Sequence, residues 1–462
     1  MKYKSLEDRI QSHGNPVDML RNAPSAGYVF PDRPEYKNWR DEQESWRKTA
    51  VLLDQSFHMT DHYFEGPDVK RLLQDLSINS YKNFGKNKAK QIVVCNHDGY
   101  VIGDGILFGF EENRVSIVNR PNPGNWVQYH AETGNYDVKV EIDQRAESWA
   151  NASRRLFRYE VQGPLATDIL AKATGKALPD IKFFNMGEIS ISGCNMRALR
   201  HGMAGAPGLE LMGPWMDRET VKDAILRAGE EFGLVQGGAK AYSTVAHESG
   251  WVPSELPAIY SGESMKPYRE WLPGNGFEAA ASLGGSFVSN NIEDYYLTPM
   301  DLGYSHILNV DHDFIGREAL ERRADEPHKK KVTLLWNSED VIRVFASLFQ
   351  DGDRYKFMDI PASHYATYPY DSVLKSGNHM GFSLYPVYTS NFRRWISLGL
   401  LDESVAQPGT ELTVLWGEPD GGSHKPAVER HIQTEMRVTV AECPIANDAR
   451  ENYRPHKLPF QN

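Results

Sequence analysis

The stretch from GMAGAPGLEL (residues 202–211) to KAYSTVAHESGW (residues 240–251) decides how the rest of the chain is interpreted. Two glycine-rich turns enclose an amphipathic segment that we predict to be a helix, since glycine tolerates the positive φ angles of tight turns. The stretch carries Glu210, Tyr242, Glu248 and Trp251. Two carboxylates, a phenol and a large flat ring are suited to holding an aromatic, nitrogen-rich cofactor beside a reacting group.

Composition excludes several classes of protein. A length of 462 residues predicts about three domains of about 150 residues each. With 51 Lys and Arg against 62 Asp and Glu, the net charge is −11. We therefore expect no nucleic-acid partner, which needs a basic surface, and no attraction to an anionic membrane.

Cysteine usage and the amino terminus predict the compartment. Cys95, Cys194 and Cys443 share no CxxC spacing, which argues against a disulfide framework and against structural zinc. The first residues contain no apolar signal-peptide core, and no apolar run approaches the ~18 residues of a membrane span. We expect a cytoplasmic protein.

Periodicity predicts the elements of the first 330 residues. We expect short helices and loops over 1–50, strand-like alternation over 51–66 and a helix over 68–76. Residues 91–110 and 114–130 read as a three-stranded meander. Two further strands (137–142 and 188–192) flank a helix that begins at Pro164 and stops near Gly175, and a last helix over 313–323 is capped by Asp313.

The remaining residues read as a β module and a tail. A charged hinge at 326–331 precedes short strands separated by turns, which indicate a sandwich or barrel. We therefore predict domains at 1–330 and 331–446. Residues 447–462 form a polar tail that packs on a neighbour or stays mobile.

Three further side chains are candidates for a polar site. His58 and His62 lie four residues apart, but no third ligand is near, so we expect no metal and assign His58 to a polar site. Tyr28, in the loop SAGYVF (25–30), either packs or lines that site. Arg120, between a strand and Pro121, either forms a surface salt bridge or binds a carboxylate with its planar fork.

The motifs, taken in order, resemble the glycine-cleavage T-protein (aminomethyltransferase) superfamily over most of the chain. The matching segments are DQSFHM with EGPD (54–68), GYVIGD (99–104), NRPN (119–122), GPLA (163–166), GMAGAPGLEL (202–211), HESG (247–250) and DFIGREAL (313–320), followed by GTELTVLW (409–416). Arg120-Pro121 stands where T-proteins carry alanines, and Ala246 where they carry arginine. These departures resemble the branch of tetrahydrofolate-dependent aryl O-demethylases, the vanillate and syringate demethylases.

The resemblance implies an α+β fold: two interlocked α/β domains around a central folate opening, plus a C-terminal β-barrel. It implies that Glu210 binds the pterin and that Trp251 packs on the cofactor. Asp104 matches an acid near the folate, although an Asp-containing turn explains it equally. Glu248 either contacts folate or caps a junction between elements.

The resemblance also assigns the substrate pocket. Tyr242 matches a tyrosine thought to act in chemistry, as a general acid or hydrogen-bond donor to the leaving oxygen. Tyr28, His58 and Arg120 match the polar residues of an aryl pocket, in which Arg120 holds either a carboxylate or a phenolate oxygen.

The implied reaction moves the methyl group of a methoxylated aromatic acid, of the vanillate, syringate or 3-O-methylgallate type, to N5 of tetrahydrofolate. The products are 5-methyltetrahydrofolate and a phenol, and the enzyme is a monomer or homodimer. One alternative is demethylation of a sulfonium or amine, as in dimethylsulfoniopropionate; such a site would need aromatic faces and acids around the cation. The other alternative is a folate-binding accessory protein without turnover.

Overall fold

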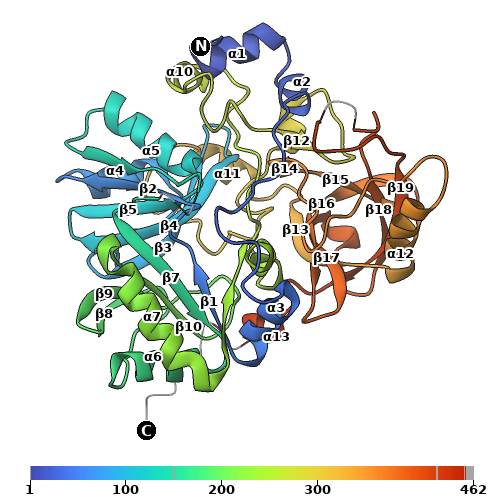
Figure 1. Ribbon diagram of the computed structural model, residues 1–462. Helices are drawn as coiled ribbons and strands as arrows, with labels where there is room; N and C mark the ends of the chain where they lie inside the picture. The colour runs from blue at the N-terminus through green and yellow to red at the C-terminus, as the bar shows by residue number, and fades with distance from the viewer. Residues whose placement is uncertain (1, 149, 151, 423–424, 452, 454–462) are drawn as a thin grey trace.

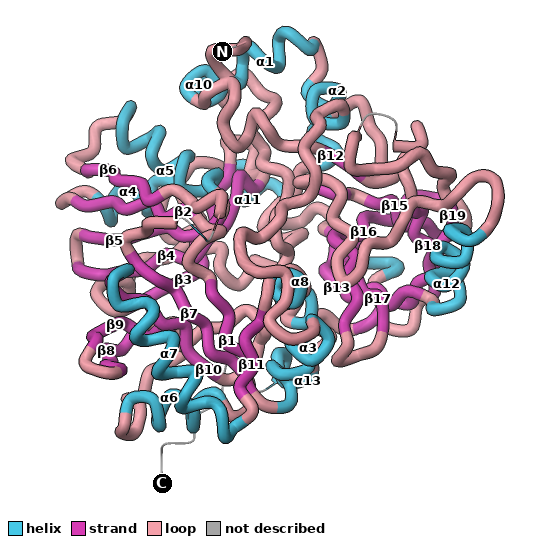
Figure 2. The backbone as a smooth tube through the Cα atoms, in the orientation of Figure 1, coloured by secondary structure: helices cyan, strands magenta, loops and turns pink. Residues whose placement is uncertain are grey.

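Two β-sheets on one side and a closed β-barrel on the other form the frame of the protein (Figure 1). The computed structural model describes residues 2–148, 150, 152–422, 425–451 and 453. Long loops run between the sheets and the barrel (Figure 2). The expected α+β class with a C-terminal barrel is confirmed.

The first sheet is antiparallel and has five strands. In spatial order these are β3 (Lys88–Cys95), β4 (Val101–Glu111), β5 (Arg114–Asn119), β2 (Thr60–Glu65) and β6 (Lys139–Asp143). Helix α4 (Val69–Leu76) buries all four apolar side chains whose spacing predicts it, and it packs against α5 (Pro121–Thr133).

Helix α5 corrects one prediction. The segment 114–130 is strand only as far as Asn119, and the residues from Pro121 onward are helical. Pro121 occupies the first helical position, where its missing N–H costs nothing and its fixed φ suits the helix. Proline therefore starts an element here, in addition to ending the strand.

The second sheet has six strands and lies beside the first. Their order is β11 (Leu234–Gly237), β1 (Ala50–Asp54), β7 (Leu156–Gln162), β10 (Gly208–Pro214), β9 (Cys194–Leu199) and β8 (Met186–Ile191). Only β1 and β11 pair in parallel among the strands of this sheet. Glu210 of β10 stands directly opposite Glu160 of β7.

Two helices pack on this second sheet. Helix α7 (Arg218–Gly229) is the helix predicted between the glycine-rich turns. Helix α6 (Ala166–Thr174) begins two residues after the predicted Pro164 and ends before Gly175, whose φ of 68° is left-handed. Apolar residues of both helices share one core with β1, β7 and β10.

The C-terminal module, predicted to be either a sandwich or a barrel, is a closed barrel. Around the barrel the strands are β13 (Lys329–Trp336), β17 (Arg394–Asp402), β16 (Asn378–Thr389), β15 (Asp371–Lys375), β18 (Glu411–Trp416) and β19 (Thr434–Ala441). Helix α12 (Ser338–Ala346) packs on it. Lys329 already pairs with Asp402, so the second half of the predicted hinge is strand.

The remaining elements are short and connect the three bodies. They are α1 (Leu6–His13), α2 (Pro16–Arg21), α3 (Trp39–Lys48), α8 (Ala239–Tyr242), α9 (Val245–Glu248), α10 (Lys266–Trp271), α11 (Arg317–Arg323), α13 (Asn447–Glu451) and the paired strands β12 (Leu283–Gly284) and β14 (Tyr368–Pro369). Helix α11 starts after Gly316, so Asp313 is not its cap as predicted. Most of the predicted tail, residue 452 and residues 454–462, lies outside the described residues.

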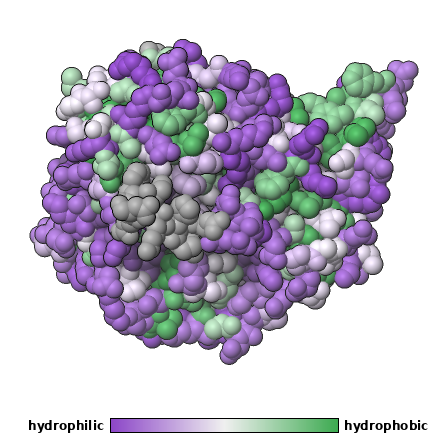
Figure 3. Space-filling view, turned by 90° about the horizontal axis from the view of Figure 1, so that it is seen from below, coloured by the Kyte–Doolittle hydropathy of each residue, from purple (hydrophilic) through white to green (hydrophobic). Residues whose placement is uncertain are grey.

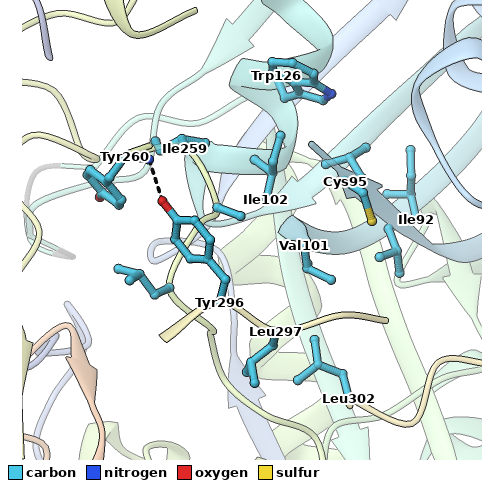
Figure 4. Packing of buried hydrophobic residues seen from close by; sticks show 14 of the residues in the cluster. Ile92, Cys95, Val101, Ile102, Trp126, Ile259, Tyr260, Tyr296, Leu297 and Leu302 are labelled. Atoms are coloured by element: carbon cyan, nitrogen blue, oxygen red, sulfur yellow. Dashed lines mark hydrogen bonds between the residues drawn. The ribbon is translucent and has the colours of Figure 1, made fainter. Parts of the chain in front are cut away.

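The loops between the bodies are part of the core. Ile259, Tyr260, Leu297 and Leu302 pack against the first sheet and α5, and the Tyr260 N–H donates to the Tyr296 hydroxyl at 2.9 Å (Figure 4). The outer face seen in Figure 3 is mostly hydrophilic, with apolar residues in separate areas. No helix in the described part of the chain is long and apolar enough to cross a membrane.

Candidate active site

A cavity of about 340 Å³ is lined by residues from both sheets, the amino-terminal loop and the central loops. Six of the eight predicted site residues line it: Tyr28, His58, Arg120, Glu210, Tyr242 and Trp251. Thr367, beyond the predicted boundary at residue 330, also contributes to the wall. Segments far apart in the sequence therefore build one site.

The local folds explain how these side chains meet. His58 lies in the turn between β1 and β2, and Arg120 follows the last residue of β5. Glu210 belongs to β10, and Tyr242 is the last residue of α8. Because β1 and β11 are neighbours, the turn after β1 and helix α8 after β11 bring His58 and Tyr242 together.

His58 and Tyr242 form a hydrogen-bonded pair at the cavity wall. The Tyr242 hydroxyl lies 3.0 Å from His58 Nε2, and Phe30 packs edge-on against both rings. Burial, and then the nearby carboxylates of Glu160 and Glu210, raise the pKa of Tyr242 well above its usual value. Desolvation and the surrounding arginines, Arg154 foremost, lower the pKa of His58 to about 3. Both partners are therefore neutral at neutral pH.

The low pKa of His58 has a consequence for stability. An unfolded histidine takes up a proton near pH 6.5, whereas folded His58 does not until about pH 3, so stability falls as the pH drops below about 6.5. In the His58→Gln variant, we expect the free energy of unfolding to change less steeply with pH, by up to about 1.4 kcal/mol per pH unit. Urea unfolding of the wild type and the variant from pH 7 to pH 4 measures this difference in slope. Identical slopes would show that folded His58 takes up its proton at the same pH as an unfolded histidine.

A buried ion network holds Glu210 in place. Arg158 binds Glu210 at 3.0 Å and Asp61 at 2.6 Å, and Arg154 binds Asp61 at 2.9 Å and Asp143 at 3.0 Å. Burial raises the pKa of Glu210, while Arg158 lowers it. The sequence alone does not mark Arg154, Arg158 or Asp61, because they belong to no recognisable motif and their partners lie on other strands.

Two polar atoms at the cavity have no partner among the described residues. They are Gln55 Oε1 and His201 Nε2, both buried. Together with the Glu210 carboxylate and the Trp251 ring, they give the cavity hydrogen-bond groups and an aromatic face, a combination that suits a flat, nitrogen-rich ligand. The DQSFHM segment contains Gln55, but nothing in its spacing singled it out.

Comparison with known proteins agrees with this architecture. The GCVT N-terminal domain family matches residues 22–255. Syringate O-demethylase of Sphingobium sp. (strain NBRC 103272 / SYK-6) is 48% identical over 451 residues, covering 97% of this chain and 98% of that protein. The chain belongs to the glycine-cleavage T-protein family.

More distant relatives agree with this placement. Sesamin methylene transferase of Sinomonas sp. (strain No.22) is 32% identical, covering 90% of this chain and 91% of that protein. The crystal structure of the glycine cleavage system aminomethyltransferase T from Bartonella henselae superposes with a TM-score of 0.60 at 15% identity. It covers 92% of this chain and 94% of its own. That likeness shows the shared T-protein fold.

Asp104 lies behind the wall of the cavity. It is buried, accepts a hydrogen bond from the Tyr304 hydroxyl at 3.0 Å, and does not line the cavity. Desolvation raises its pKa, and hydrogen bonds from Gln91, Tyr304 and Trp251 lower it. The structure thus places Asp104 against the lining residue Trp251.

The structure places Glu248 away from the cavity. Its carboxylate accepts hydrogen bonds from Trp46 Nε1 and Arg47 Nε of α3, both at 3.0 Å. From the barrel side, Thr389 donates at 2.5 Å and Asn391 at 3.0 Å. Of the two predicted roles, this geometry matches a residue that joins elements.

We expect Glu248→Ala to lower the free energy of unfolding by about 3–5 kcal/mol, because it leaves Arg47 without its buried partner. The exposed Glu263→Ala is the control and should change stability by less than about 0.5 kcal/mol. Denaturant unfolding tests stability, and titration with tetrahydrofolate tests binding. An unaltered stability together with lost folate affinity would instead place Glu248 at the cofactor.

Among the described residues, no cluster of three or more His, Cys, Asp or Glu is arranged to hold a metal ion. His62 lies on β2, and its Nε2 is 3.1 Å from Asn125 Oδ1. Desolvation lowers the pKa of His62 to about 4. His62 is a buried neutral side chain with an amide partner.

Proposed function

We propose that this protein is a tetrahydrofolate-dependent aryl O-demethylase that removes the methyl group of a methoxylated aromatic acid. The observation that carries the proposal is the neutral Tyr242–His58 pair, which shares one cavity with Arg120 and Glu210. The 48% identity to a syringate O-demethylase over nearly the whole chain supports it.

Four residues would hold tetrahydrofolate. Glu210 would accept hydrogen bonds from the pterin, Trp251 would pack on it, and Gln55 and His201 would gain the partners that they lack. When bound, the cofactor supplies N5 as the acceptor of the methyl group.

Tyr242 would stabilise the departing oxygen. A methyl ether is cleaved when negative charge develops on its oxygen, and a fixed donor in a dry site stabilises that charge. When His58 Nε2 carries the ring hydrogen, it donates to the Tyr242 oxygen and leaves the phenol hydrogen free for the ether. Because the pKa of Tyr242 is raised, it serves as a hydrogen-bond donor better than as a proton donor.

The cavity disfavours a cationic substrate. The wall includes Arg120 and Arg145, and neither has a carboxylate partner within 4.0 Å among the described residues. A sulfonium or ammonium group would be repelled by these charges, whereas an arene carboxylate or a phenolate oxygen would be attracted.

Incubation of the enzyme with tetrahydrofolate and a panel of methoxybenzoates tests the proposal. We expect equimolar 5-methyltetrahydrofolate and phenol from at least one methoxybenzoate. Methyl transfer from a sulfonium or amine alone would favour a demethylase that acts on such substrates. Folate binding without turnover of any methyl donor would favour an accessory protein.

A further inference from the structure

Arg145 lines the cavity but belongs to no motif. It follows β6 by two residues, and its backbone N–H donates to Thr60 Oγ1 at 3.5 Å. The guanidinium lies 5.1 Å from the centroid of the Tyr28 ring and 5.2 Å from that of Phe277. Both rings also line the cavity. Aromatic faces hold an arginine in place while its N–H edges stay free for a ligand.

Charge pairing around His58 distinguishes Arg145 from the structural arginines. Four arginines lower the pKa of His58: Arg154, Arg120, Arg158 and Arg145. Arg154 and Arg158 are neutralised by buried carboxylates. Within the described ranges, Arg120 and Arg145 have no such partner. The cavity therefore carries two guanidinium groups that have no carboxylate within 4.0 Å among the described residues.

These two arginines have different surroundings. Arg145, Tyr28 and Phe277 are half-buried, and the neighbouring Val29 is 81% exposed. Arg120 instead lies beside the buried hydroxyls of Tyr368 and Tyr385, whose pKa values burial raises and Arg120 lowers. Arg120 is half-buried as well, so the two arginines differ in their neighbours: half-buried rings beside an exposed residue at Arg145, and buried hydroxyls at Arg120.

We infer that Arg145, held by the rings of Tyr28 and Phe277, is the subsite for the substrate's carboxylate, and that Arg120 faces an oxygen on the ring. The inference rests on the proposed function, because it names the anionic group of that substrate. A carboxylate stays charged throughout the reaction, so the half-buried rings and the exposed residue beside Arg145 suit it. A substrate of this class carries its carboxylate and its ring oxygens at separate places, so each can pair with one of the two arginines.

Substitution of Arg145 by methionine tests this subsite. For syringate, we expect Arg145→Met to raise KM by roughly 10–100-fold, the loss of a charge-assisted hydrogen bond, with kcat nearly kept. For 2,6-dimethoxyphenol, which lacks the carboxylate, KM should not change. Arg145→Lys, which keeps the charge without the planar fork, should be intermediate. The exposed Arg322→Met is the matched control and should behave as the wild type.

Calorimetric titration separates this inference from the proposed function. The probes are 3,4-dihydroxybenzoate and catechol, which bind without any methyl transfer. Arg145→Met should weaken the benzoate alone by roughly 10–100-fold, while Arg120→Met should weaken both compounds. Equal effects of Arg145→Met on both compounds, or a benzoate-specific loss in Arg120→Met only, would overturn the inference. Absence of turnover with intact benzoate selectivity would overturn only the proposed function.

Discussion

Replacing Tyr242 by phenylalanine is expected to slow methyl transfer by roughly 10²–10⁴-fold. The change removes one hydroxyl and keeps the ring that packs against Phe30 and His58. Only stabilisation of the developing phenolate is lost, so the affinity for tetrahydrofolate should be nearly unchanged. Single-turnover kinetics at saturating cofactor measure the chemical step, and fluorescence titration measures cofactor binding.

A second tyrosine gives the control for this variant. Tyr365 donates its hydroxyl to the Phe357 carbonyl at 2.9 Å and does not line the cavity. Tyr365→Phe should therefore keep the wild-type rate. Wild-type turnover in Tyr242→Phe would remove this phenol from the chemistry, and the proposed role of the His58 pair would fall with it.

Replacing Glu210 by glutamine should weaken tetrahydrofolate binding by roughly 10–150-fold, the contribution of a hydrogen bond to a charged group. The amide keeps the size of the side chain, and Arg158 keeps Asp61 as its partner, so the fold should survive. At saturating cofactor the rate of methyl transfer should stay near the wild-type value. Isothermal titration gives the dissociation constant.

Glu160 provides the matched control across the sheet. It pairs with Glu210 in the register, and burial followed by the Glu210 charge raises its pKa well above the usual value. It accepts a hydrogen bond from the Met203 N–H at 2.6 Å. Because a protonated acid resembles an amide, Glu160→Gln should bind the cofactor almost normally. Equal losses in both variants would mean that Glu210 acts only through the packing of this sheet.

The site residues that belong to motifs could be assigned because those motifs, in their order along the chain, resemble a known family. The turn after β1 and the glycine-rich segment contain His58, Glu210, Tyr242 and Trp251, and these residues meet at the cavity. These residues lie on strands or next to turns of the sheets, and the sequence patterns of those elements can be recognised. Helix α7, between the two turns, could be predicted for the same reason.

Pairings across the fold could not be predicted. Arg158 and Asp61 meet because two different sheets come together, and Arg145 reaches the cavity only because β6 pairs with β2. Pro121 begins a helix that looked like the end of a strand. Glu248 shares a motif with the site but contacts α3 and the barrel, which neighbouring residues in the sequence do not reveal.

Tracing the methyl group tests the central claim most directly. The enzyme is mixed with tetrahydrofolate and syringate carrying a ¹³C-labelled methoxyl group, and the products are followed by carbon NMR. We expect the label to move to the N5-methyl of 5-methyltetrahydrofolate while an equal amount of the phenol forms. Label that remains on the arene, or that appears as methanol or formaldehyde, would contradict it.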